Sequence, residues 1–206
     1  PGGGGRVHVA GLRRSPRLSG RRTAPGHGAI RIPHEGLSPV TRHLILMRHA
    51  KSDWGDRSLP DRDRPLNARG RAAAPRMGAW LAAAGILPDT VLVSPARRTR
   101  ETWRAVAEAL DQAPVPIFEP RLYEADEATI IEVLRHAQGQ SVLVLGHNPG
   151  LAHAAQALTA APPDHPRFAD YPTGATLILR LPVADWAELD RGTGRAIAFA
   201  VPRDLD

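Results

Sequence analysis

The sequence predicts an α/β fold: a three-layer sandwich with a mostly parallel central sheet and an antiparallel strand at one edge. From residue 43 onward, short runs of Val, Leu and Ile alternate with longer stretches of helical pattern. This alternation is typical of a parallel sheet that helices cover on both faces. The last two apolar runs have no helix between them, which favours an antiparallel pairing at the sheet edge.

The elements follow from these runs in order. Strands are expected at the runs HLILMR (43–48), TVLVS (90–94), SVLVLG (141–146), ATLILRL (175–181) and AIAFAV (196–201). Helices are expected over Ala68–Ala84, Pro95–Leu110, Glu127–Ala137 and Pro149–Thr159. Pro75 removes a hydrogen bond inside the first helix, so we expect a kink there. The stretch 161–174 predicts a loop.

The composition divides the chain into two regions, a tail over residues 1–40 and a folded domain over residues 41–206. Residues 1–42 hold eight arginines and one acid, Glu35, so they carry a net charge of +7, while the remainder carries −1. The Gly-, Pro- and Arg-rich tail has no apolar periodicity, and we expect it to be disordered. Because the basic charge belongs to the tail, the folded domain is not expected to bind nucleic acid.

Two further features exclude classes of protein. The sequence has no cysteine, which excludes disulfides and thiolate chemistry. No apolar run is long enough to span a bilayer, so no membrane association is expected. We expect a cytoplasmic protein.

Polar side chains follow three of the predicted strands. Arg48 and His49 end the first, Ser94 precedes Arg98 after the second, and His147 ends the third. In a parallel sheet these ends meet at one edge, where ligands bind in open α/β folds. Arginine and histidine in this arrangement predict an anion site that needs no metal or cofactor.

The same residues suggest how the two following helices begin. Ser94 and Asn148 are residue types that cap helices, and each is followed by a proline suited to the first helical position. Helix starts at these places would point backbone N–H groups at the anion. Taken singly, each residue is better explained by a turn or an exposed basic face; the joint occurrence at three strand ends favours a site.

Four stretches carry a resemblance to a known family. LMRHAKS, RPLNARG, VLVSPARRTRET and VLGHNPG occur in this order and resemble the histidine phosphatase superfamily, also called phosphoglycerate-mutase-like. RHAKSDW and LYEAD are similar to its phosphohistidine phosphatase branch. The resemblance covers about residues 43–181.

The resemblance implies roles for individual residues. His49 matches the nucleophile that takes the phosphoryl group, and His147 matches the second histidine of the pocket. Arg48 and Arg98 match the phosphate-binding arginines, whereas Arg97 does not. Arg64 and Asn148 are candidates for substrate contacts. Nearby positive charge should lower the pKa of His49, which keeps the imidazole neutral and nucleophilic.

Many members of the family also use an acid as proton donor to the leaving group. Glu124, Asp126 and Asp53 are candidates, although ordinary surface charge is the better explanation for all three. A missing acid would suit a phosphohistidine substrate, because imidazole leaves readily once it is protonated.

The sequence therefore predicts a metal-independent phosphatase that works through a phosphohistidine intermediate, with phosphohistidine in a partner protein as its substrate. A small-molecule phosphomonoesterase of the same superfamily and a non-catalytic phosphate-binding module remain as alternatives. A mutase is disfavoured because the chain is short, and an RNA-associated protein finds support only in the tail.

Overall fold

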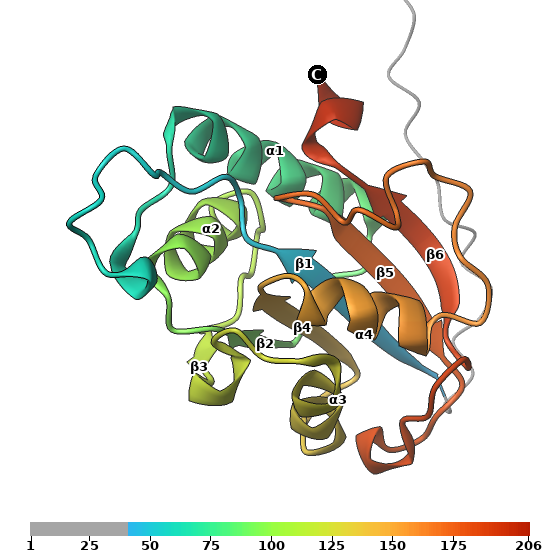
Figure 1. Ribbon diagram of the computed structural model, residues 1–206. Coiled ribbons are helices and arrows are strands. Elements are labelled where there is room, and N and C mark those ends of the chain that lie inside the picture. The colour runs from blue at the N-terminus through green and yellow to red at the C-terminus, as the bar shows by residue number, and fades with distance from the viewer. Residues whose placement is uncertain (1–40) are drawn as a thin grey trace, which may run out of the picture.

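The computed structural model describes residues 41–206, so the prediction for the tail, residues 1–40, lies outside the described residues. A six-stranded sheet forms the middle of the molecule, with the strands in the order β3-β2-β4-β1-β5-β6 (Figure 1). The strands are β1 Arg42–Arg48, β2 Thr90–Val93, β3 Ile117–Phe118, β4 Ser141–Gly146, β5 Thr176–Leu181 and β6 Arg195–Ala200.

The strand directions confirm the predicted sheet. β4 pairs in parallel with both β1 and β2, and β2 pairs in parallel with β3. β5 runs antiparallel to β1, and β6 runs antiparallel to β5. β3 is the one strand of this sheet that was not predicted, because its two exposed residues lie between two prolines and show no apolar run.

Four helices connect the strands: α1 Ala68–Ala84, α2 Arg97–Ala107, α3 Glu127–Arg135 and α4 Gly150–Leu158. α1 has the predicted bounds and continues through Pro75. Its first turn is capped by Asn67, whose side chain accepts a hydrogen bond from the Gly70 N–H. α2 and α4 begin later than predicted, after Ala96 and Pro149, neither of which makes a side-chain capping bond. The expectation that Ser94 and Asn148 cap these helices is therefore wrong.

The helices form the two outer layers. Alternate residues of β1 point to opposite faces: Ile45 and Met47 pack with residues of α1 and α2, whereas Leu44 and Leu46 pack with residues of α3 and α4. All four of these β1 side chains are fully buried. The three-layer sandwich is thus confirmed, with β1 near the centre of the sheet (Figure 1).

The backbone where β1 ends is held on every side. The Arg48 N–H donates to the Ala175 carbonyl at 2.9 Å, and the His49 N–H donates to the Gly146 carbonyl at 3.1 Å. The Gly174 N–H donates to the carbonyls of both Arg48 and His49, at 3.2 and 3.0 Å. Neighbours on both sides of the strand therefore fix the position of His49.

Three short 3₁₀ turns and the C-terminal one complete the described chain: η1 Asp61–Asp63, η2 Pro120–Leu122, η3 Trp186–Glu188 and η4 Pro202–Leu205. Stretch 161–174 contains no helix or strand, as predicted. No helix within residues 41–206 combines the length and the apolar character needed to cross a membrane.

Candidate active site

The register of β1 against β4 brings the two histidines together. Arg48 lies opposite Gly146, so His49 and His147, the residues that follow, leave neighbouring strands at the same edge. Both side chains are buried, and the centroids of their rings are 5.2 Å apart. The sequence analysis predicted this pairing from the strand ends.

A backbone hydrogen bond sets the proton position on His49. Nδ1 lies 2.7 Å from the carbonyl oxygen of Ala50. A carbonyl only accepts, so Nδ1 carries the proton and Nε2 keeps its lone pair. The pKa of His49 falls to about 3, first because the ring is buried and then because Arg98, Arg48 and Arg64 are nearby, while the bond to Ala50 acts in the opposite direction. The predicted lowering is confirmed, but burial contributes more than the charges do.

His147 has the opposite tautomer. Its Nδ1 lies 3.2 Å from Nη2 of Arg98, which only donates, so Nδ1 is the unprotonated nitrogen. Nε2 then carries the proton and donates to the Ser94 hydroxyl at 2.7 Å. Burial, followed by the proximity of His49 and the charge of Arg98, lowers the pKa of His147 to about 3. Ser94 therefore orients a histidine instead of capping a helix.

These lowered pKa values predict a loss of stability in acid. Between pH 6.5 and about 3, His49 is protonated in the unfolded chain but not in the folded chain, so the unfolded state binds more protons. The free energy of unfolding therefore decreases as the pH is lowered through this window. Each such histidine contributes about 1.4 kcal/mol per pH unit within this window. The free energy of unfolding should be measured by urea denaturation at pH 6, 5 and 4. Its decrease per pH unit should be smaller by about this amount in His49→Asn than in the parent.

The control for this measurement is His153→Asn, which removes an exposed histidine from α4. We expect this variant to show the same pH dependence of the free energy of unfolding as the parent. An equal pH dependence in the parent and in His49→Asn would show that His49 is not held neutral by the fold.

Three guanidinium groups surround the histidines. Arg98 comes from the first turn of α2 and is buried, Arg64 is buried just after η1, and Arg48 is half-buried at the end of β1. The Nε atom of each is buried without a hydrogen-bond partner among residues 41–206. Unpaired buried donors are costly, and an anion in the pocket would satisfy them.

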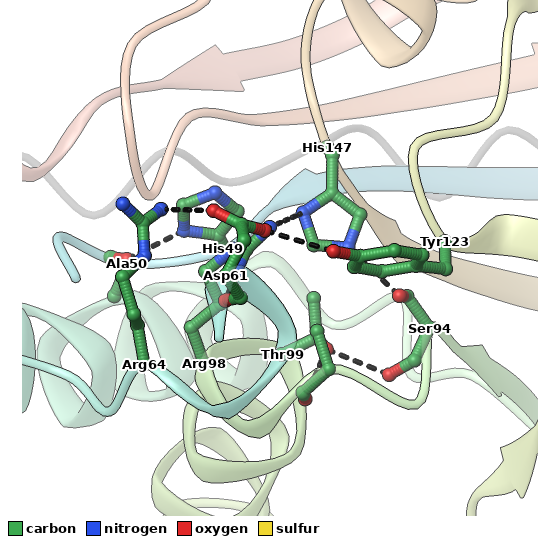
Figure 2. Close-up of polar contacts among 10 residues, drawn as sticks. His49, Ala50, Asp61, Arg64, Ser94, Arg98, Thr99, Tyr123 and His147 are labelled. Carbon is green, nitrogen blue, oxygen red and sulfur yellow. Dashed lines mark hydrogen bonds and ion pairs between the residues drawn. The ribbon is translucent and has the colours of Figure 1, made fainter. Parts of the chain in front are cut away.

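Asp61 is the residue that the sequence analysis missed. Its carboxylate contacts Nη2 of Arg98 at 2.9 Å and Nη2 of Arg64 at 2.7 Å, and it accepts a hydrogen bond from the Tyr123 hydroxyl at 3.0 Å (Figure 2). Its backbone carbonyl accepts a further bond from Nη1 of Arg98 at 2.6 Å. The only signal in the sequence is an acid three residues before Arg64, a spacing common on exposed helical turns.

The carboxylate of Asp61 is held ionised. Burial alone would raise its pKa, but the hydrogen bonds from Tyr123 and Arg98 and the charges of Arg98 and Arg64 together lower it. Figure 2 shows the carboxylate between the two arginines, in front of His49. An anion that uses these guanidinium groups has to compete with it.

The three candidate proton donors lie elsewhere. Asp53 accepts a hydrogen bond from the Gly55 N–H at 2.8 Å, and Asp126 caps α3 through the Thr129 N–H at 2.8 Å. Glu124 is exposed, and no hydrogen bond or ion pair of its side chain is found within residues 41–206. In the described part of the chain, none of the three contacts the histidines or the arginines.

The amide of Asn148 faces the segment before β5. Its Nδ2 donates to the carbonyls of Asp170 and Tyr171 at 3.3 and 3.0 Å, and its buried Oδ1 has no partner in the described region. The Tyr171 carbonyl also accepts from Nη1 of Arg48 at 2.9 Å. Asn148 thus supports the wall of the pocket through Tyr171, and its predicted contact with substrate stays a prediction.

Trp54 is an exposed aromatic residue that stacks on Arg64. The guanidinium carbon of Arg64 lies 3.2 Å from the centroid of its ring, while 66% of the residue is exposed. Stacking on the ring face leaves the in-plane N–H groups of Arg64 available for contacts such as the ion pair with Asp61. Within residues 41–206 no group of three or more His, Asp or Glu side chains could hold a metal ion.

Sequence comparison places this arrangement in a family. The model of the histidine phosphatase superfamily (branch 1) matches residues 44–128. An uncharacterised chloroplastic protein of Arabidopsis thaliana is 34% identical over 151 residues, which cover 68% of this chain and 69% of that protein. The chain belongs to the histidine phosphatase superfamily.

Solved structures agree with this membership. A putative phosphohistidine phosphatase SixA from Nakamurella shares 28% identity with a TM-score of 0.66, over 79% of this chain and 96% of that one. The SixA from Agrobacterium tumefaciens shares 27% identity with a TM-score of 0.63, over 81% and 100%. A phosphoglycerate mutase from Nocardioides is 38% identical over 80 residues, but these cover only 38% of this chain and 32% of the mutase.

Proposed function

We propose that this protein is a phosphatase that removes the phosphoryl group of phosphohistidine in a partner protein through a covalent intermediate on His49. The observation that carries the proposal is the buried, neutral His49 beside three arginines with unpaired Nε donors. Two structural neighbours described as phosphohistidine phosphatases, with 28% and 27% identity, support the choice of substrate. Cytoplasmic residence stays a prediction.

The reaction would proceed in two steps. Nε2 of His49 attacks phosphorus, the bond from phosphorus to the leaving imidazole breaks, and that imidazole departs with a proton on its ring. Water then attacks the phosphohistidine, which releases inorganic phosphate and restores neutral His49. The arginines stabilise the charge on the equatorial oxygens in both steps.

The role of Asp61 in this scheme differs from that of the proton donor expected from the sequence. A carboxylate whose pKa is lowered is poorly suited to protonate a leaving group at neutral pH. It is better suited to accept the proton of the attacking water. Phosphoesters with poor leaving groups would then react slowly, whereas a leaving imidazole, which takes its own proton from solvent, would not.

A substrate panel tests the proposal. The full chain is assayed with EDTA present against a phosphohistidine protein, p-nitrophenyl phosphate and several sugar phosphates. We expect the highest kcat/KM for the phosphohistidine protein. A preference for a sugar phosphate would favour a small-molecule phosphomonoesterase, and tight phosphate binding without turnover would favour a binding module; either result contradicts the proposal.

Asp61 also predicts how strongly the product binds. Asp61→Asn removes the internal anion that occupies Arg64 and Arg98, so inorganic phosphate should inhibit about tenfold more strongly, which corresponds to about 1.4 kcal/mol. The measurement is the inhibition constant of phosphate in a p-nitrophenyl phosphate assay. Asp63→Asn, at an exposed position of the same turn, is the matched control. Unchanged or weaker inhibition in Asp61→Asn would show that the carboxylate does not compete with phosphate.

A further inference from the structure

A second basic pocket lies beside the active site. It encloses about 380 Å³ and is lined by five cationic side chains and one acid, Asp206. The cations are Lys51, Arg69, Arg76, Arg167 and Arg203. They come from four places: the segment after β1, helix α1, the segment before β5 and the C-terminal turn η4, which lies beside α1 (Figure 1).

Three of these cations have no counter-charge. Arg76 pairs with Asp206, and Arg167 pairs with Asp170 at 3.0 Å. Within residues 41–206, the side chains of Lys51, Arg69 and Arg203 make no ion pair or hydrogen bond. A pocket lined by charges of one sign attracts ligands of the opposite sign, and its volume lies in the range of ligand sites.

The pocket shares a wall with the active site. Pro172 and Thr173 line it, and they lie between Tyr171, whose carbonyl binds Arg48, and Gly174, whose N–H binds the carbonyl of His49. Lys51 stands two residues after His49. A ligand in this pocket therefore lies against the same segment, residues 171–174, that contacts Arg48 and His49.

We propose that this basic pocket binds aspartate and glutamate side chains that flank the phosphohistidine of the partner protein. The inference rests on the proposed function, since a phosphohistidine in a protein reaches His49 only with its neighbouring residues lying across the surface around the pocket. The surplus of three cations fits carboxylates, and the exposed positions of Arg69 and Arg203 leave the pocket open to a chain that passes over it.

The test uses two phosphohistidine peptides of equal length, one with glutamates and one with glutamines on either side of the histidine. Each exposed ion pair contributes little by itself, but three cations act together, so the parent should prefer the glutamate peptide about tenfold in kcat/KM, which corresponds to about 1.4 kcal/mol. In Arg69→Gln/Arg203→Gln the preference should fall to about twofold or less. In the control Arg104→Gln/Arg195→Gln, which removes two exposed arginines outside the pocket, it should stay as in the parent.

The control also accounts for the basic tail. Residues 1–42 carry a net +7 and attract acidic peptides in every variant alike, so only the difference between the two double variants counts. No preference in the parent, or the same preference in both variants, would overturn the proposal. A third outcome would also overturn it: the enzyme prefers a small bisphosphate to the corresponding monophosphate, this preference depends on Arg69 and Arg203, and the peptides show no such dependence.

A binding measurement separates this proposal from the proposed function. The unphosphorylated glutamate peptide is titrated calorimetrically into the parent and both double variants. If no phosphohistidine peptide is hydrolysed, the proposed function fails, and the titration alone tests the proposal about the pocket. Weaker binding to Arg69→Gln/Arg203→Gln than to the control supports the proposed binding of carboxylates in the pocket, and equal binding overturns it.

Discussion

Brief reaction with a phosphodonor followed by an alkaline quench should leave phosphate on His49, and His49→Ala should abolish both the label and turnover. Nε2 is the free nucleophilic nitrogen because Nδ1 is committed to the Ala50 carbonyl. Alkali is the useful quench because phosphohistidine is labile in acid. The label is located by mass spectrometry of peptides kept at high pH, and a thermal melt of His49→Ala checks that the fold is intact.

His147→Ala is the companion variant. It should slow phosphoryl transfer without removing the label, because His147 touches Arg98 and Ser94 but is not the attachment point. EDTA should change neither result, since the phosphoryl charge is met by guanidinium groups. A label on another residue, or turnover that survives His49→Ala, would defeat the mechanism even though the family stands.

Arg98→Ala should lower kcat/KM by roughly 30- to 10³-fold, which corresponds to about 2–4 kcal/mol of transition-state stabilisation. Arg98 is buried and contacts His147, and its Nε has no hydrogen-bond partner among residues 41–206. Its neighbour Arg97 is directed elsewhere: its side chain is 54% exposed and pairs with Glu101 at 2.7 Å on the surface of α2. Arg97→Ala should change kcat/KM by no more than about twofold, because exposed ion pairs contribute little.

The comparison is internally matched, since both substitutions remove an arginine from the first turn of the same helix. Circular dichroism and melting temperature should be measured for both variants. Equal losses of activity at equal stability would mean that the arginine that binds the phosphate had been assigned in the wrong register within the first turn of α2.

The parts of the site that could be predicted from sequence are those set by strand ends. His49, His147 and Arg48 lie directly at the ends of β1 and β4, and a parallel sheet has no other way to arrange them than at one edge. The same reasoning gave the layers, because strands buried on both faces show continuous apolar runs. The boundaries of α2 and α4 were less predictable: a serine and an asparagine before a proline suggest a cap, but in this fold Ser94 binds His147 and Asn148 binds the segment before β5.

Asp61 and Tyr123 could not have been predicted in the same way. They lie 62 residues apart in the sequence and belong to loops whose position depends on the whole tertiary structure. Local pattern assigns an acid in such a segment to the surface. Only the packing of η1 against α2 shows that its carboxylate lies between Arg64 and Arg98.

The hydrogen bonds that hold the backbone at the end of β1 have a consequence for the design of new specificities. Arg48, His49 and Gly174 are joined to one another and to β4, and the Ala50 N–H is joined to the Thr102 hydroxyl at 3.0 Å. The backbone that carries the reacting imidazole therefore cannot shift to meet a leaving group of a different shape without breaking several of these bonds. Residues 53–60, which include the Trp54 that stacks on Arg64, are by contrast mostly exposed. Directed evolution toward other phosphorylated compounds should accumulate its changes in this exposed segment and leave the residues around His49 as they are.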